Sequence, residues 1–290
     1  MVAKRTPARP LLLVLTAIIS VQFGGALAAT LVPQIGAGGS VTLRLLFATG
    51  ILWAIARPRV RGHSRAAWLT VLAFGCALGL MNLAFYASLA HLHIGVAVTV
   101  EFLGPLTLAT VLSRRPRDLA AVGAAAVGVL LISQALNTPL AHLEWTGLGL
   151  AALAGACWAA YILASGRAGR EFPQLEGLAL AMAVAFVVTL PFGVSSAPSW
   201  STESVAKGLG IAVLSSVLPY SLELAALRHL SPGVFGILLS LEPAAAALAG
   251  LVVLGQRLTP LQLTGMGLVV LASTLVMGAG QPKDPAASGG

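Results

Sequence analysis

Long apolar stretches recur along most of this chain, and they constrain its fold more than any other feature. Ten stretches of about 20 mostly apolar residues can be marked out, each long enough to cross the hydrocarbon core of a bilayer. A backbone inside lipid must satisfy its own hydrogen bonds, which a helix does within one segment. We therefore predict an all-α integral membrane protein with ten transmembrane helices. They cover about residues 11–31, 38–56, 67–90, 93–113, 118–136, 145–165, 175–195, 205–227, 232–254 and 258–279.

Basic residues between the predicted spans orient the chain in the membrane. With the N-terminus in the cytoplasm, 14 lysines and arginines fall on the cytoplasmic side and 2 on the outer side. Cytoplasmic loops carry such an excess, so both chain ends are predicted to be cytoplasmic. The net charge of +8 then reflects topology and does not indicate nucleic-acid binding. The cytoplasmic group is Lys4, Arg5, Arg9, Arg57, Arg59, Arg61, Arg65, Arg114, Arg115, Arg117, Arg167, Arg170, Arg228 and Lys283, and the outer group is Lys207 and Arg257.

The first apolar stretch has two interpretations. It follows a basic N-terminus and contains Ala-Leu-Ala at 26–28, which mimics a signal-peptidase site. However, its run over about 11–32 is longer than the core of a typical signal peptide and long enough to span a bilayer. We therefore predict that it is the first retained helix.

The two halves of the sequence repeat. A shift of 138 residues brings LMNLAFYASLAHLHIGVAVTVEFLGP (80–105) onto LPYSLELAALRHLSPGVFGILLSLEP (218–243), with matched histidine, glycine and proline positions. Each half holds five predicted spans, an odd number, so the halves enter the membrane in opposite directions. Many secondary transporters use such an inverted repeat, with the binding site near the midplane. The predicted divisions are a cytoplasmic N-terminus (1–10), two five-helix repeats (11–136 and 145–279) and a disordered cytoplasmic tail (280–290).

Four ionisable residues stand inside the predicted spans: Arg44, Glu101, Glu223 and Glu242. A charge at the bilayer centre costs roughly 2.5–3.5 kcal/mol, so such residues usually face a cavity and contact a substrate, an ion or each other. They indicate a transporter rather than an anchor. For Arg44 a second interpretation stays open, in which the side chain reaches the outer surface.

Prolines accompany the carboxylates. Pro105 follows Glu101 by one turn and cannot donate to the carbonyl of residue 101, and Pro243 directly follows Glu242. We expect these prolines to break the helix at a cavity, although a kink made only for packing would also explain them. Pro219 belongs to a third group, in which Ser216, Pro219, Tyr220 and Glu223 share one helix face.

Further polar and aromatic side chains complete the predicted site. Asn82 and Tyr86 are four residues apart on one helix, and the 138-residue shift takes Asn82 to Tyr220. Tyr161 follows Trp158 by three residues on another. We expect Asn82, Tyr86, Tyr161 and Tyr220 to line the cavity, while ordinary core packing is the alternative for the aromatic rings.

The charge balance points to a class of cargo. Three buried carboxylates and one arginine leave a net charge of −2 if all are ionised, so at least one glutamate is expected to hold a proton or a cationic ligand group. A carboxylate that holds either a proton or an ammonium group is the minimal device for proton–amine exchange. We predict that Glu101 does this, with Glu223 and Glu242 as secondary proton sites. Arg44 could hold a substrate carboxylate, and an amino acid carries both groups.

Several classes of function lack sequence support. No zinc-protease, nucleophile-elbow, phosphate-loop or dinucleotide motif occurs, so we predict neither an enzyme nor a cofactor. Cys76 and Cys157 have no metal-ligand spacing, and no metal site is predicted. Gly147, Ala151, Gly155 and Ala159 form a stripe that suits packing of one half on the other. The same stripe is compatible with a dimer but does not require one.

Five motifs carry a resemblance to a known family. They are NLAFYASL (82–89), IGVAVTVEFLGPL (94–106) followed by SRRPRDLAA (113–121), GACWAAYIL (155–163), SSVLPYSLELAALRHL (215–230) and FGILLSLEPAAAALAG (235–250). With ten helices in two halves, the chain resembles the EamA-type drug/metabolite transporter superfamily and, more narrowly, its threonine/homoserine exporter group. The resemblance covers about residues 11–279. It implies a bacterial inner-membrane carrier that exports threonine, homoserine or analogues, driven by the proton gradient and embedded in lipid.

Three alternatives remain at this point. The same fold could export another metabolite, a drug or a purine, since members of the superfamily differ widely in cargo. A passive channel would never move substrate uphill. A membrane scaffold or sensor would have little reason to keep ionisable groups in its spans.

Overall fold

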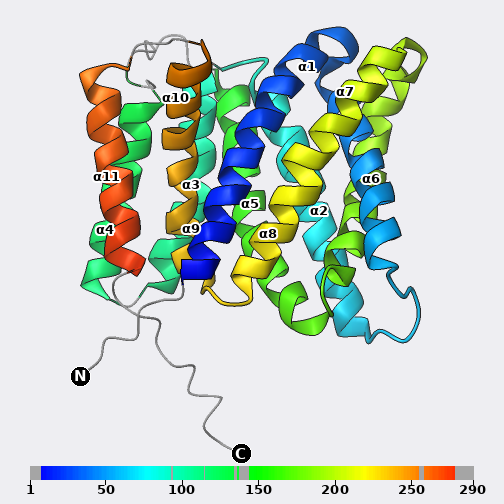
Figure 1. Cartoon of the computed structure of the whole chain (residues 1–290), viewed down its shortest axis with the longest axis horizontal. Helices are drawn as coiled ribbons and strands as arrows, with labels where there is room; N and C mark the ends of the chain where they lie inside the picture. The colour runs from blue at the N-terminus through cyan, green and yellow to red at the C-terminus, as the bar shows by residue number, and fades with distance from the viewer. Residues whose placement is uncertain are drawn as a thin grey trace, which may run out of the picture.

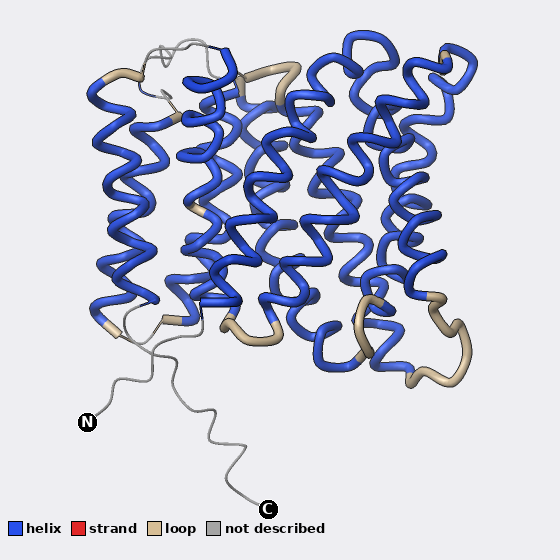
Figure 2. Tube along the Cα trace, in the orientation of Figure 1, coloured by secondary structure: helices blue, strands red, loops and turns tan. Residues whose placement is uncertain are grey.

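The computed structural model describes residues 8–92, 94–113, 115–133, 136, 144–254 and 258–277. Within these residues every regular element is helical and no strand occurs (Figure 2). Six helical stretches are long and apolar enough to cross a membrane, and three shorter apolar helices accompany them. The predicted all-α membrane class is therefore confirmed. The predicted tail (280–290) and most of the N-terminus (1–10) lie outside the described residues.

The helices follow the predicted spans closely along the chain. For example, the span predicted at 67–90 is observed at Arg65–Ser88. The elements are α1 (Ala8–Ala56), α2 (Arg65–Ser88), α3 (Ile94–Leu112), α4 (Pro116–Ile132), α5 (Trp145–Glu171), α6 (Glu176–Gly193), η3 (Val194–Ser199), α7 (Thr202–Ala212), η4 (Val213–Val217), α8 (Leu218–Leu227), α9 (Pro232–Leu239), α10 (Leu241–Leu254) and α11 (Pro260–Met277).

Helix α1 contains two predicted spans joined by a sharp reversal. Gly36 has φ 74° and ψ 168°, a backbone conformation open to glycine and strained for other residues. The first limb rises from the lower edge in Figure 1, and the second descends beside α6. Two spans therefore follow each other with almost no loop between them.

The predicted span at 205–227 is observed as three consecutive helical stretches, α7, η4 and α8. The middle one, Val213–Val217, is a π-helix. Pro219 stands at the start of α8, where its missing N–H removes a hydrogen bond from the preceding turn. A π-helical turn absorbs such a defect, and turns of this kind are frequent at functional sites.

The other two prolines behave differently from each other. The helix containing Pro243 is interrupted at Ser240, so Pro243 falls in the first turn of α10, which tolerates proline. Helix α3 continues through Pro105 from Ile94 to Leu112. The expected break at Pro105 is therefore wrong, and the packing of α3 against α5 and α9 offsets the cost of the missing hydrogen bond.

The helices form one bundle whose ends lie on two opposite edges (Figure 1). Helix α2 packs against α5 and α6, α1 packs against α6, α7 and α8, α3 packs against α5 and α9, and α4 packs against α11. The α4–α11 contact brings the backbones of Gly128 and Gly265 together. Helix α1 begins and α11 ends at the same lower edge of Figure 1.

Candidate transport site

Arg44 lies in the second limb of α1 and is turned into the protein, with only 5% of its surface exposed. Its terminal nitrogen Nη2 donates a hydrogen bond to Oδ1 of Asn82 on α2. Asn82 is fixed in turn, because its Nδ2 donates to the carbonyl oxygen of Leu78 over 2.8 Å. The alternative in which Arg44 reaches the outer surface is therefore wrong.

The guanidinium of Arg44 is only partly satisfied by the protein. Its Nε is buried and has no hydrogen-bond partner. Among the described residues, no carboxylate forms an ion pair with it. Arginine presents its donors in a planar fork that matches a carboxylate, and a buried charge is costly without compensation. The free edge of Arg44 is thus suited to an anionic group of a ligand.

A second polar contact joins Tyr161 on α5 to Glu223 on α8. The Tyr161 hydroxyl donates to Oε2 of Glu223 over 2.6 Å, and both residues are buried. The Tyr161 ring contacts the rings of Phe74 and Tyr220, with centroid distances of 5.5 Å and 5.6 Å. Because these rings confine the phenol, its hydroxyl holds the carboxylate in one place.

Tyr220 connects the two contacts. It lies three residues before Glu223 on α8 and is buried. Its hydroxyl interacts with the amide of Asn82, and its electrostatic neighbours include Arg44, Glu223 and Tyr86. A buried cation and a buried carboxylate are therefore linked through one phenol.

Glu101 on α3 and Glu242 on α10 have no partner of this kind. Glu101 is buried and Glu242 is half-buried. Glu242 interacts electrostatically with both Glu223 and Glu101. Within the described part of the chain, neither Glu101 nor Glu242 makes a hydrogen bond or an ion pair through its carboxylate. The structure therefore brings the three predicted carboxylates together, while Glu101 and Arg44 are not in contact.

Backbone contacts position Glu101. A Cβ atom on Gly155 of α5 would meet the backbone of Glu101, and one on Gly104 of α3 would meet the carbonyl of Gly155. Beside them, the rings of Phe102 and Trp158 form a T-shaped contact with centroids 4.8 Å apart. Gly155 belongs to the predicted small-residue stripe, and its predicted role in packing the later part of the chain on the earlier part is confirmed.

The remaining predicted residue, Tyr86, is half-buried on α2. Its ring lies 6.0 Å from that of Phe85 in a T-shaped arrangement, and it interacts electrostatically with Tyr220. It therefore lies at the edge of the polar group rather than in its centre.

Two enclosed hydroxyl groups flank the tyrosine pair. The Oγ atoms of Ser165 and Ser216 are buried; that of Ser165 interacts with the Tyr161 hydroxyl, and that of Ser216 has no hydrogen-bond partner. Ser216 belongs to the predicted face with Tyr220. Ser165 was not predicted, although its position four residues after Tyr161 is a signal that could have found it.

The sequence interpretation also missed a group of residues at the lower end of the bundle. We call Arg59, His63 and Glu176 the lower polar cluster. The backbone N–H of Arg59 donates to Oε1 of Glu176 over 2.8 Å, and Nε2 of His63 lies 3.3 Å from the same oxygen. This cluster ties the connection between α1 and α2 to the start of α6. Its signal in the sequence is weak, because the partners are 117 residues apart.

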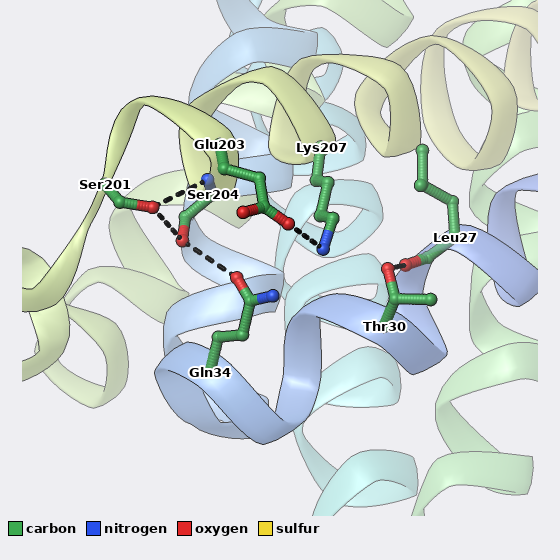
Figure 3. Close-up of polar contacts among 7 residues, drawn as sticks. All are labelled: Leu27, Thr30, Gln34, Ser201, Glu203, Ser204 and Lys207. Carbon is green, nitrogen blue, oxygen red and sulfur yellow. Dashed lines mark hydrogen bonds and ion pairs between the residues drawn. The ribbon is translucent and has the colours of Figure 1, made fainter.

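A second cluster was missed at the opposite end of the bundle, and Figure 3 shows it. We call Gln34, Ser201 and Ser204 the upper polar cluster. Oγ of Ser204 donates to Oε1 of Gln34 over 3.1 Å and lies 3.0 Å from Oγ of Ser201. Beside it, Lys207 and Glu203 form an ion pair of 2.6 Å within one helix. This cluster ties the reversal in α1 to the start of α7.

Long apolar helices that enclose a linked set of ionisable side chains define an integral membrane transporter. Two comparisons with known proteins support this class. The EamA-like transporter family matches residues 145–278. The threonine/homoserine exporter RhtA of Escherichia coli (strain K12) is 40% identical over 266 residues, which cover 91% of this chain and 90% of that relative. RhtA of Salmonella typhimurium (strain LT2) is similar to the same extent. The chain belongs to the EamA-like transporter family and is a transporter, not an enzyme.

A solved structure gives the same result for the fold alone. A protein known from a crystal structure superimposes with a TM-score of 0.74 at 17% identity, covering 92% of this chain and 96% of that protein. The arrangement of helices described above is thus shared with an experimentally determined structure.

Proposed function

We propose that this protein exports threonine, homoserine or closely related small amino acids across the bacterial inner membrane in exchange for protons. The observation that carries the proposal is Arg44, a buried guanidinium with an unpartnered Nε, which Tyr220 links to the carboxylate of Glu223. An amino acid offers a carboxylate to the first group and an ammonium to the second. The relatives named threonine/homoserine exporters support this choice of cargo.

The proposed architecture is ten spans in two inverted repeats, 11–136 and 145–279, with cytoplasmic segments 1–10 and 280–290. Helix contacts support it, since the 138-residue shift takes α2 onto α7 and α8, and α5 onto the first limb of α1. Helix α2 packs against α5, and correspondingly α7 and α8 pack against α1. The same shift exchanges α3 with α9 and α10, and α4 with α11; α3 is in contact with α9, and α4 is in contact with α11.

The proposed mechanism is alternating access between these repeats. Arg44 receives the substrate carboxylate, with Asn82 holding its other edge. A buried carboxylate, Glu101 in the simplest scheme with Glu223 and Glu242 as further candidates, holds a proton or the substrate ammonium. Tyr86, Tyr161 and Tyr220 line the site, and the helix irregularities next to Pro219 and Pro243 give the second half local freedom to move. Basic residues at the lower edge support cytoplasmic chain ends.

The test uses purified protein in liposomes with an acidic interior and labelled threonine or homoserine outside. Antiport predicts accumulation of the amino acid as protons leave. The Arg44→Gln variant should lower the rate of accumulation by at least about tenfold, because the substrate carboxylate loses its cationic partner and removing one member of a buried charge pair costs 2–5 kcal/mol. Arg61→Gln, on an exposed loop arginine, is the matched control and should transport normally. Accumulation of neither amino acid by well-folded wild-type protein would reject the proposal.

A further inference from the structure

The three buried glutamates differ in their surroundings. Glu223 accepts a hydrogen bond of 2.6 Å from Tyr161, and it shares Tyr220 with Arg44. Glu101 and Glu242 have neither a hydrogen bond nor an ion pair among the described residues. One carboxylate is therefore held in a fixed position near the cation, and two are left without a partner.

Helix packing places the two unpartnered carboxylates at a similar height. A Cβ on Gly236 of α9 would meet the carbonyl of Pro105 on α3, so the two helices touch at this level. Along α3, Glu101 lies four residues from the contact, or about 6 Å at 1.5 Å per residue. Glu242 lies six residues beyond Gly236, past the interruption at Ser240, and on the same side of the contact as Glu101, because α3 and α9 run in opposite directions (Figure 1). Glu242 interacts electrostatically first with Glu223 and then with Glu101, and the second interaction agrees with this geometry.

Two carboxylates in this position cannot both be ionised cheaply. Like charges that share a buried site repel strongly, and one of the two then retains a proton. Neutralisation by a cation would require one nearby, but Arg44 hydrogen-bonds to Asn82 and is linked to the carboxylates only through Tyr220.

No other group on the surrounding helices offers a positive charge at this level. Helices α9 and α11 carry no ionisable side chain, and α4 carries Arg117 and Asp118 only in its first turn at the lower edge. The ionisable groups that remain on the neighbouring elements are Cys157, Tyr161, Arg167, Arg170 and Glu171 on α5, Tyr220 and Glu223 on α8, Arg9 and Arg44 on α1, and Arg65, Cys76 and Tyr86 on α2. Of these, Arg9, Arg44, Arg65, Arg167 and Arg170 are cationic, and all of them except Arg44 are exposed residues near the ends of their helices.

We propose that Glu101 and Glu242 form a two-carboxylate site that holds one exchangeable proton, and that Glu223, held by Tyr161, receives the substrate ammonium. This inference rests on the proposed exchange of amino acids for protons. It assigns proton binding and binding of the substrate ammonium to different residues. When the ammonium reaches Glu223, its positive charge lies next to Glu242 and favours the ionised form of the pair. The shared O–H bond then breaks, its proton passes to water, and no other covalent bond changes.

The experiment measures proton release when threonine or homoserine binds to the purified full-length protein in weakly buffered detergent, using a pH indicator. The wild type should release about one proton per bound amino acid, as one shared site predicts. Glu101→Gln and Glu242→Gln should each abolish proton release. The double variant should show the same loss of release as each single variant, because the two groups act as one unit. Glu223→Gln should instead weaken amino-acid binding by at least about tenfold.

Controls separate these effects from misfolding and from failure of the proposed function. Glu203→Gln changes an exposed glutamate and should bind and release as the wild type does, and Glu101→Asp and Glu242→Asp should retain release because they keep the carboxyl group. If the wild type binds the amino acid and releases a proton, but only one of the variants Glu101→Gln and Glu242→Gln loses this release, the two-carboxylate site is overturned and the proposed function stands. Binding of neither amino acid by the folded wild type would overturn the proposed function and the coupling role together.

Discussion

The lower and upper polar clusters occupy corresponding places in the two halves of the chain but use different chemistry. The 138-residue shift takes His63 of the lower cluster to Ser201 of the upper one. The lower cluster joins the connection before α2 to the start of α6, and the upper cluster joins the start of α7 to the reversal in α1. The lower cluster depends on Glu176, a buried carboxylate, whereas the upper cluster depends on the exposed amide of Gln34.

This difference indicates that the two ends of the bundle are held with unequal strength. Hydrogen bonds to an ionised group are roughly twice as strong as those between neutral groups, and burial strengthens them further. A carrier that alternates between two open states moves more easily toward the state that breaks the weaker contacts. We therefore expect the upper end, which is the outer side in the proposed topology, to open at lower cost.

The largest expected effect comes from Glu176→Ala. This change leaves the backbone N–H of Arg59 and the ring of His63 without their shared acceptor, at a cost of about 2 kcal/mol. The apparent Tm of the purified protein in detergent should fall clearly. Glu171→Ala, which changes an exposed glutamate five residues earlier, is the matched control and should leave the Tm unchanged. An equal Tm for both variants would show that the lower cluster does not stabilise its end of the bundle.

A smaller effect is expected from Gln34→Ala in the upper cluster. The change removes a hydrogen bond between neutral groups at an exposed position, at a cost of about 0.5 kcal/mol. The Tm should fall by clearly less than it does for Glu176→Ala. Thr30→Ala is the control, because the Thr30 hydroxyl donates only to the Leu27 carbonyl within α1 (Figure 3). A decrease as large as that of Glu176→Ala would show that the two ends are equally strong.

The smallest effect is expected from Glu203→Gln. Its ion pair with Lys207 lies within one helix and joins an exposed carboxylate to a half-buried lysine, and ion pairs near the surface contribute little to stability. We expect no measurable change in Tm at either low or high salt. A substantial change at low salt only would mean that this pair belongs to the upper cluster and that the upper cluster is also charged.

Much of the fold follows from the sequence because lipid leaves the backbone few choices. The span predicted at 67–90 is recovered as α2 because a long apolar run between a basic loop and a turn allows little else. The π-helix before Pro219 could not be predicted, since a helix can answer the missing N–H of a proline with a kink or with a π-helical turn, and the sequence does not distinguish them. Likewise, proline chemistry alone suggested a break at Pro105, but α3 continues through it, where tertiary packing offsets the missing hydrogen bond.

The members of the candidate site were easier to predict than their partners. Arg44, Glu101, Glu223 and Glu242 stand out in apolar surroundings, because buried charge is rare in a membrane span. The hydrogen bond from Tyr161 to Glu223 joins positions 62 residues apart, and helix periodicity carries no information about such contacts. Glu176 stayed unnoticed for a related reason, since at the end of a span a carboxylate looks like any other surface group.

The single-residue reversal at Gly36 has a consequence for how this chain can change during evolution. Arg44 lies eight residues after Gly36 on an otherwise continuous helix. The number of residues between the two positions therefore determines the direction in which the Arg44 side chain points. One residue inserted between the two positions would rotate everything after it by about 100°, since an α-helix has 3.6 residues per turn. Arg44 would then turn away from Asn82. Variation in length is therefore not tolerated along the stretch between Gly36 and Arg44.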